Sequence, residues 1–290
     1  MPTSRRRADL LPVVRSLRER AIQKPRRRGI SLAELLIAGT IMTMIAGGMG
    51  ALALTMQTAN DHCQAQNVAA QHGRVVSARI QRAVQRATAS EAFPGCVTFS
   101  ETIDGYSYPD TLVVWSPLTI AANPTGLPRV SELLLFCPDP EQPSRLLEIR
   151  DTADLSEVPL LTATTAWESL LSDLKTDGLA ARVELSDLLR TGNPRGLNSA
   201  ETDPAKLRAC VRFNVVLAPT AAQFGSYRSG ATTWSEVDWP LDLYSSKSGT
   251  RQVACQFELQ FDPTSAATTG AGQAIVPCFG SATLTYQLAR

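Results

Sequence analysis

The fold of this 290-residue chain is decided by residues 26–56, which read RRRGISLAELLIAGTIMTMIAGGMGALALTM. Three arginines and Gly29 precede an apolar run in which Glu34 is the only ionisable side chain up to Met56. The 22 residues Leu35–Met56 carry no charge and include no proline. About 20 apolar residues in a helix, at ~1.5 Å each, cross the ~30 Å hydrocarbon core of a bilayer. We therefore predict a membrane-spanning helix, because a helix satisfies its own backbone hydrogen bonds in lipid.

The acidic residue at the start of this run is its most informative feature. A carboxylate is costly to bury in lipid, so Glu34 is expected to have a partner and a function. Gly29, followed by Ile-Ser-Leu-Ala-Glu at 30–34 and an apolar helix, resembles the N-terminal signal of type IV prepilins and of type II secretion pseudopilins. The match covers residues 26–56, about a tenth of the chain.

The resemblance implies a processing site and an assembly residue. A prepilin peptidase would cut after Gly29 and methylate the new amine of Ile30. Glu34 matches the family's glutamate, which pairs with a subunit's N-terminal amine during assembly. The alternative is an uncleaved signal anchor in which Glu34 is incidental.

Three departures from the family pattern favour a minor pilin or pseudopilin over a major filament subunit. Ala51 stands where many major pilins carry a proline, Ile30 replaces the commoner Phe or Met, and the leader has 29 residues.

Small residues in the apolar run predict a site of helix packing. Gly47 and Gly50 pair with Ala51 and Ala46 at small-xxx-small spacing, which lets helix backbones approach closely in lipid. The alternative is that these glycines only allow a long helix to bend.

The charge distribution predicts the orientation. Ten of the 28 Lys and Arg and two of the 27 Asp and Glu lie in residues 1–29, a net charge of +8 that leaves −7 for the rest of the chain. Basic residues beside a membrane helix stay in the cytoplasm. We expect a single-pass inner-membrane protein with a cytoplasmic leader and an extracytoplasmic C-terminal domain. Such a protein can also be assembled into a filament. A basic stretch directly before an apolar run indicates targeting rather than nucleic-acid binding.

The helical pattern continues beyond the membrane segment. Residues 57–90 contain no proline and one glycine, and apolar or small side chains and one histidine recur every three or four positions. We expect one face made of Ala65, Val68, His72, Val76, Ile80, Ala83, Val84 and Ala87. Pro94-Gly95 should end the helix. Four arginines, at 74, 79, 82 and 86, lie mostly off this face and indicate a solvated surface or pairing with acidic neighbours rather than a nucleic-acid stripe.

The rest of the chain is predicted to be rich in strands, which gives an α+β fold, pilin-like, with an antiparallel β-rich globular domain. The expected strands are Cys96–Ile103, Thr111–Trp115, Leu133–Cys137, Arg145–Ile149, Arg208–Ala218, Val253–Phe261 and Ala282–Leu288. Asp104-Gly105 indicates a turn. Trp167–Lys175 and Val183–Leu189 are candidate short helices, and residues 192–204 and 219–235 are candidate loops. The expected organisation is a cleaved leader at 1–29, the membrane half of the helix at 30–56, its amphipathic half at 57–92 and the β-rich domain at 93–290.

All six cysteines follow the apolar run, so the predicted orientation places them in an oxidising compartment. Six cysteines allow fifteen pairings, and the sequence does not choose among them. Cys63 has no obvious local partner and is expected to be free or intermolecular. At least one disulfide is expected among Cys96, Cys137, Cys210, Cys255 and Cys278.

Residue patterns for catalysis are missing. The sequence has no Gly-x-Ser-x-Gly, His-Glu-x-x-His, P-loop or dinucleotide motif, and its two histidines, at 62 and 72, both lie on the predicted helix. We expect no enzyme activity, no cofactor and no metal. Asp238 and Asp242 are candidates for a calcium loop but lack EF-hand spacing. The four tryptophans are expected to pack in the core or its loops, with Trp234 and Trp239 as an alternative interaction edge.

These observations predict a minor type IV pilin-like protein or pseudopilin, a structural subunit of a membrane-anchored filament. The implied partners are a prepilin peptidase, other pilins or pseudopilins, an inner-membrane assembly platform and membrane lipid, with no nucleic acid. The alternative is a single-pass protein with an uncleaved anchor and a ligand-binding or enzymatic β-rich ectodomain.

Replacing Gly29 by valine should leave the leader attached, because a peptidase that reads the residue before the cut has no room for a branched side chain. Immunoblotting of membrane fractions would show a band about 29 residues larger than the mature wild-type band. A mature-sized product from Gly29→Val would rule out cleavage at this junction.

Overall fold

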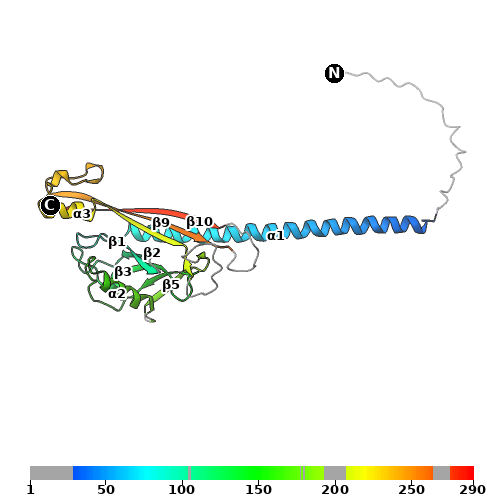
Figure 1. Cartoon of the computed structure of the whole chain (residues 1–290), viewed down its shortest axis with the longest axis horizontal. Coiled ribbons are helices and arrows are strands. Elements are labelled where there is room, and N and C mark those ends of the chain that lie inside the picture. Colours follow the sequence, from blue (N-terminus) through cyan, green and yellow to red (C-terminus); the bar gives the residue numbers. More distant parts are fainter. Residues whose placement is uncertain (1–28, 104–105, 177, 179, 193–206, 264–274) are drawn as a thin grey trace, which may run out of the picture. The chain divides into compact units, whose positions relative to one another are not determined.

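A computed structural model describes residues 29–103, 106–176, 178, 180–192, 207–263 and 275–290. The predicted leader up to residue 28, the Asp104-Gly105 turn and nearly all of the predicted 192–204 loop lie outside the described residues. The chain divides into two compact units, Met1–Gln57 and Thr58–Arg290. A long N-terminal apolar helix is followed by antiparallel sheets, so the α+β prediction is confirmed (Figure 1).

The long helix, α1, runs without interruption over Leu32–Gln85. The prediction that it continues to residue 92 is wrong by about two turns. The backbone N–H of Thr88 donates to the carbonyl oxygen of Trp115 at 2.9 Å, so the chain enters sheet hydrogen bonding before Pro94 is reached. Gly95 then turns the chain with a φ of +88°, a conformation that favours glycine.

The second half of α1 forms part of the core of the Thr58–Arg290 unit. The predicted face is confirmed at Val76, Ile80, Ala83 and Val84, which are buried, whereas Ala87 is also buried but lies beyond the end of the helix at Gln85. It is wrong at Val68, which is 42% exposed, because the buried face begins instead with Ala69 and Gly73.

Small residues occupy that face because α1 lies very close to a strand there. A Cβ atom on Gly73 would lie 3.2 Å from the Cys278 sulfur, and the Ser77 hydroxyl is 3.2 Å from the same sulfur. The close approach of α1 to this strand requires small side chains, whereas the predicted face was chosen mainly for its apolar residues.

The strands in the described part of the chain form three antiparallel sheets. The five-stranded sheet has the order β1-β2-β3-β4-β5 and consists of Cys96–Ile103, Tyr106–Trp115, Leu133–Pro138, Leu146–Arg150 and Ala181–Ser186. The three-stranded sheet has the order β10-β9-β8 and consists of Val276–Ala289, Ser248–Phe261 and Val211–Ala218. The small third sheet pairs β6, Thr191–Gly192, with β7, Arg208–Ala209. The helices are α2, Thr164–Thr176, and α3, Ala221–Arg228, with single 3₁₀ turns at Val130–Glu132, Trp234–Glu236 and Pro240–Asp242.

The predicted strand cores and the helix at 167–175 are confirmed, although β2, β9 and β10 begin earlier than predicted and the segment 208–218 is split at Cys210. Two predictions are wrong. Residues 183–189 do not form a helix, because Val183 and Glu184 pair with β4 as part of β5. The predicted loop 219–235 contains α3, which begins with a capping box between Thr220 and Gln223.

Both faces of the five-stranded sheet are buried over β3, β4 and the second half of β2. Side chains of a strand alternate between its two faces. On β1 to β3, one set packs against α1 and the three-stranded sheet: Cys96, Leu112, Val114, Leu134 and Phe136. The opposite set packs against α2 and neighbouring loops: Val113, Trp115, Leu133, Leu135 and Cys137. In Figure 1, α2 accordingly lies on the other side of this sheet from β9 and β10.

One ion pair fixes α1 to the five-stranded sheet. Arg79 donates from Nε and Nη2 to the two carboxylate oxygens of Glu148 on β4, each at 2.6 Å. Glu148 is only 8% exposed, and its hydrogen bonds raise the pKa of Arg79. The predicted pairing with an acidic neighbour is therefore confirmed for Arg79, whose side chain is still 48% exposed, and the predicted solvated surface is confirmed for Arg74, Arg82 and Arg86.

Replacing Arg79 by alanine should destabilise the Thr58–Arg290 unit by about 2 kcal/mol, because a buried carboxylate loses two charge-assisted hydrogen bonds. Thermal unfolding in detergent would measure the loss. Arg82→Ala, on an exposed position of the same helix, is the matched control and should change stability by less than about 0.5 kcal/mol. Equal effects of the two substitutions would contradict the assigned role of Arg79.

Candidate functional site

The described beginning of α1 is built by a capping box. The backbone N–H and the hydroxyl of Ser31 donate to Oε2 of Glu34 at 2.9 and 3.1 Å. In return, the backbone N–H of Glu34 donates to the Ser31 hydroxyl oxygen at 3.2 Å. Ser31 is therefore the N-cap of the helix, and Glu34 is its third residue.

This geometry separates the predicted processing residues from the helix. Gly29 and Ile30 precede the N-cap, have no regular secondary structure and are exposed. Glu34 lies in the first helical turn, where the positive end of the helix dipole favours a carboxylate. Its Oε2 atom is engaged by Ser31, and no hydrogen bond from a described residue reaches its Oε1 atom.

The first half of α1 is exposed on every side. Each residue from Gly29 to Asp61 is exposed, and the helix is long and apolar enough to span a membrane. The large apolar side chains on this surface are Ile30, Leu32, Leu35, Leu36, Ile37, Ile41, Met42, Met44, Ile45, Met49, Leu52, Leu54 and Met56. A Cβ atom added to Gly47 or Gly50 would meet nothing within 4 Å, so packing within the chain does not require glycine at either position.

The folded unit contains a groove between the β1–β2 hairpin and α2. Its volume is about 730 Å³, and Asp110, Thr111 and Lys175 lie along it. The Lys175 ammonium donates to the Thr111 hydroxyl, which donates to Oδ1 of Asp110, each at 2.8 Å. Glu101 and Arg208, 3.8 Å apart, form an ion pair that also lines the groove.

Asp110 is the unusual group in this groove. It is only 6% exposed, and burial raises the pKa of its carboxyl, an effect that the charge of Lys175 and the hydrogen bond from Thr111 oppose. A buried carboxyl, a hydroxyl and an ammonium in series provide a polar recess for a small polar ligand. A paired nucleophile and base are not found along the groove in the described structure.

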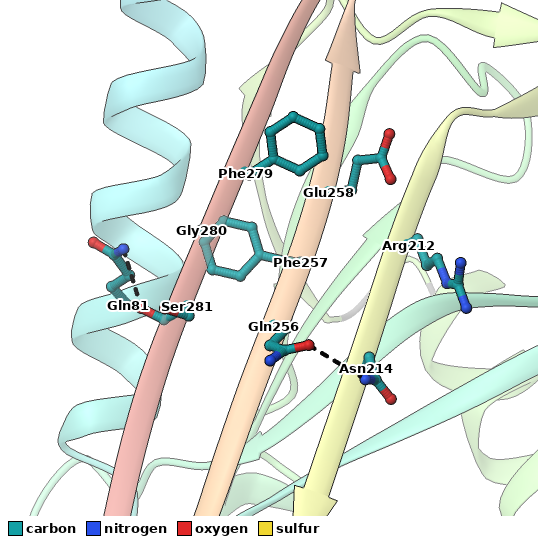
Figure 2. A pocket seen from close by; sticks show the side chains of 9 residues that line it. All are labelled: Gln81, Arg212, Asn214, Gln256, Phe257, Glu258, Phe279, Gly280 and Ser281. Carbon is teal, nitrogen blue, oxygen red and sulfur yellow. Dashed lines mark hydrogen bonds between the residues drawn. The ribbon is translucent and has the colours of Figure 1, made fainter.

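A second, shallower hollow of about 700 Å³ lies over the three-stranded sheet beside α1. Figure 2 shows its side chains, with the Gln81 amide donating to the Ser281 carbonyl oxygen at 3.2 Å. The Phe257 ring lies against Gly280, where any side chain would collide with it. Phe279 is 70% exposed, so this surface combines polar strand residues with one accessible aromatic ring.

The structure also places the other residues singled out from the sequence. Trp115 and Trp167 are core residues, and Trp234 and Trp239 are buried together in a small cluster with Phe224, which favours packing over an interaction edge. Asp238 and Asp242 do not form part of any cluster of three or more potential metal ligands among the described residues.

The Asp110–Lys175 arrangement was missed because the two residues are far apart in sequence and lack a local motif. The long helix and the capping box, in contrast, depend on neighbouring residues.

No protein-family model, curated protein or solved structure matches this chain.

Replacing Asp110 by asparagine should stabilise the protein at pH 7. Because burial raises the folded-state pKa, the wild type loses stability as pH rises from the unfolded pKa of about 4 through the folded value. Asparagine keeps an acceptor for Thr111 without this cost. Melting curves of both proteins from pH 3.5 to 8 should diverge with rising pH and converge below about pH 4.

Lys175→Met is the companion variant, because it removes the cation that favours ionised Asp110. It should lower the melting temperature at pH 7 in the wild type and have a smaller effect in Asp110→Asn. A less stable Asp110→Asn at pH 7 would mean that ionised Asp110 gains more from Lys175 than burial costs it.

Proposed function

We propose that this chain is a minor type IV pilin-like protein or pseudopilin, a structural subunit of a membrane-anchored filament. The observation that carries the proposal is Glu34 in the first turn of an exposed apolar helix, five residues after Gly29 and the basic cluster. Such a helix surface needs lipid or other helices around it, and a carboxylate at its start needs a cation.

Exposure at the junction supports processing by a prepilin peptidase. Gly29 and Ile30 are exposed and precede the helix, so their peptide bond is accessible to a protease. Cleavage after Gly29 creates an amine on Ile30, which the same enzyme methylates. Removal of residues 1–29 also removes the cluster with a net charge of +8, which the proposal places in the cytoplasm, with the Thr58–Arg290 unit outside.

The Ile30 amine and the Glu34 carboxylate also provide the proposed mechanism of assembly. The amine of Ile30 lies directly before the N-cap, and Glu34 binds Ser31 through one oxygen while its other oxygen has no described donor. In a staggered bundle, the amine of an incoming subunit meets Glu34 of its neighbour, and this pairing sets the axial step. Gly47 and Gly50 offer an open, small surface where a neighbouring helix can approach closely.

A second candidate is a membrane-anchored domain that binds a ligand and keeps its leader. Two observations favour it: the capping box gives Glu34 a role within its own helix, and the Asp110 groove offers a recess for a polar ligand. The two candidates differ at the N-terminus. Intact-mass and N-terminal peptide measurements on the purified protein distinguish methylated Ile30 from a retained Met1 leader.

Substitutions at the capping box separate the charge of Glu34 from its capping role. Glu34→Gln keeps an amide oxygen that accepts from Ser31 but loses the charge, whereas Ser31→Ala weakens the cap by about 1 kcal/mol and keeps the charge. We expect Glu34→Gln to be inserted and cleaved but to co-purify with partner pilins at least about tenfold less than the wild type, a loss equivalent to about 1.4 kcal/mol. Ser31→Ala should assemble normally.

Glu34→Ala, which loses both cap and charge, is the reference for complete loss of assembly. Insertion and cleavage are followed by immunoblotting in all three variants, so that a processing defect is not mistaken for an assembly defect. Normal assembly of Glu34→Gln together with failure of Ser31→Ala would show that Glu34 acts only as a cap.

A further inference from the structure

Two of the six cysteines lie thiol to thiol in the core. Cys96 is the first residue of β1, in the five-stranded sheet, and Cys255 lies in the middle of β9, in the three-stranded sheet. Both side chains are fully buried in the same apolar cluster. Cys96 lines a hollow together with Phe213 and Val215 of β8, and Val215 pairs directly with Cys255, so the two thiols lie close together at the boundary between the sheets.

Strand register excludes two other partners for Cys255. Cys255 pairs with Ala282 of β10, whereas Cys278 pairs with Leu259, four residues farther along β9. At ~3.3 Å per residue these two cysteines are about 13 Å apart, and a disulfide needs Cα atoms within about 7 Å. The carbonyl of Cys210 accepts from the N–H of Gln260, five residues from Cys255, which gives a separation of about 16 Å.

Sheet geometry excludes Cys137 as a partner for Cys96. Cys96 pairs with Val114, which pairs with Leu134, and these three side chains share one face of the five-stranded sheet. Cys137 is three residues beyond Leu134, so its side chain points to the opposite face, where it is buried with Trp115. The remaining thiol, on Cys63, is exposed.

We propose that Cys96 and Cys255 form a native disulfide that covalently joins the two sheets. The bond closes a loop that contains every strand from β1 to β8, as well as α2 and α3. Constraining so long a loop in the unfolded chain stabilises the folded state. The inference rests on the proposed function in one respect, because it requires the Thr58–Arg290 unit to face an oxidising compartment.

Formation of the bond requires an oxidant that itself contains a disulfide, and the reaction proceeds by two thiol–disulfide exchange steps. One cysteine thiolate attacks the disulfide of the oxidant, which forms a mixed disulfide and releases one oxidant thiol. The second cysteine thiolate attacks the protein sulfur of the mixed disulfide, which forms the Cys96–Cys255 bond and releases the second oxidant thiol. In total, the two cysteines lose two electrons and two protons, and these are taken up by the two thiols released from the oxidant.

Burial sets the order of events. Both thiols are inaccessible once the sheets have packed, and the neighbouring Cys255 thiol together with burial raises the pKa of Cys96. Exchange needs an accessible thiolate. Oxidation therefore takes place while the domain folds, and the packed core then protects the bond from reduction.

Peptide mapping of the full-length protein tests the proposal without any substitution. Cells are quenched in acid, free thiols are blocked with N-ethylmaleimide, and the denatured, unreduced protein is digested with trypsin and chymotrypsin. Chymotrypsin is needed because neither Lys nor Arg lies between Cys255 and Cys278, whereas Phe257 and Phe261 do. We expect a Cys96 peptide linked to a Cys255 peptide that separates on reduction. Maleimide on both residues would overturn the proposal.

A topology reporter distinguishes the possible causes of failure. Alkaline phosphatase fused after Arg290 is active only outside the cytoplasm. Free thiols with an active reporter overturn the disulfide and leave the proposed function intact, whereas free thiols with an inactive reporter overturn both.

Thermal unfolding provides an independent measurement. After reduction in denaturant and refolding in dithiothreitol, the wild type should melt roughly 5–15 °C lower than the untreated protein. The double variant C96A/C255A should lose this response to reductant. Cys137→Ala is the matched control, since it also removes a buried thiol but leaves the pair intact, and it should retain the full response. A wild type that is indifferent to reductant would contradict the proposal.

Discussion

The unprotected apolar surface of the first half of α1 is the constraint on which the interpretation of the whole chain depends. Every described residue up to Asp61 is exposed, and most are apolar. Apolar surface left in water costs about 25 cal/mol for each Å² that burial would remove, so a patch of this extent requires an external cover. Lipid satisfies the requirement for a single helix, and other helices satisfy it in an assembly.

The second half of the same helix is held by different interactions. Gly73 and Ser77 allow close contact with Cys278, and Arg79 reaches the buried Glu148 on the five-stranded sheet. The helix is thus an integral core element of the folded unit as well as a candidate membrane anchor.

Features that are encoded by neighbouring residues could be predicted from the sequence. Features that depend on how strands far apart in the sequence pair or pack could not. The apolar run and the strand cores have a helical or two-residue period, and each was found. The segment 183–189 was misassigned because its short apolar pattern suits either structure, and only pairing with β4 decides it. Cys96 and Cys255 meet because two sheets pack, a fact that no neighbouring residue encodes. The Ser31–Glu34 capping box was visible as Ser-x-x-Glu, but Glu34 was interpreted through its charge alone.

The capping role of Glu34 and its proposed assembly role are compatible. The hydrogen bonds from Ser31 hold one carboxylate oxygen and restrict the rotamer of the side chain. A carboxylate that is already ordered loses less conformational entropy when a cation binds, so the cap lowers the cost of accepting a neighbour's amine. A flexible glutamate in the same turn would pay that cost at every assembly step. In the proposed filament, a preorganised acceptor at the start of each helix would make the axial step both favourable and uniform.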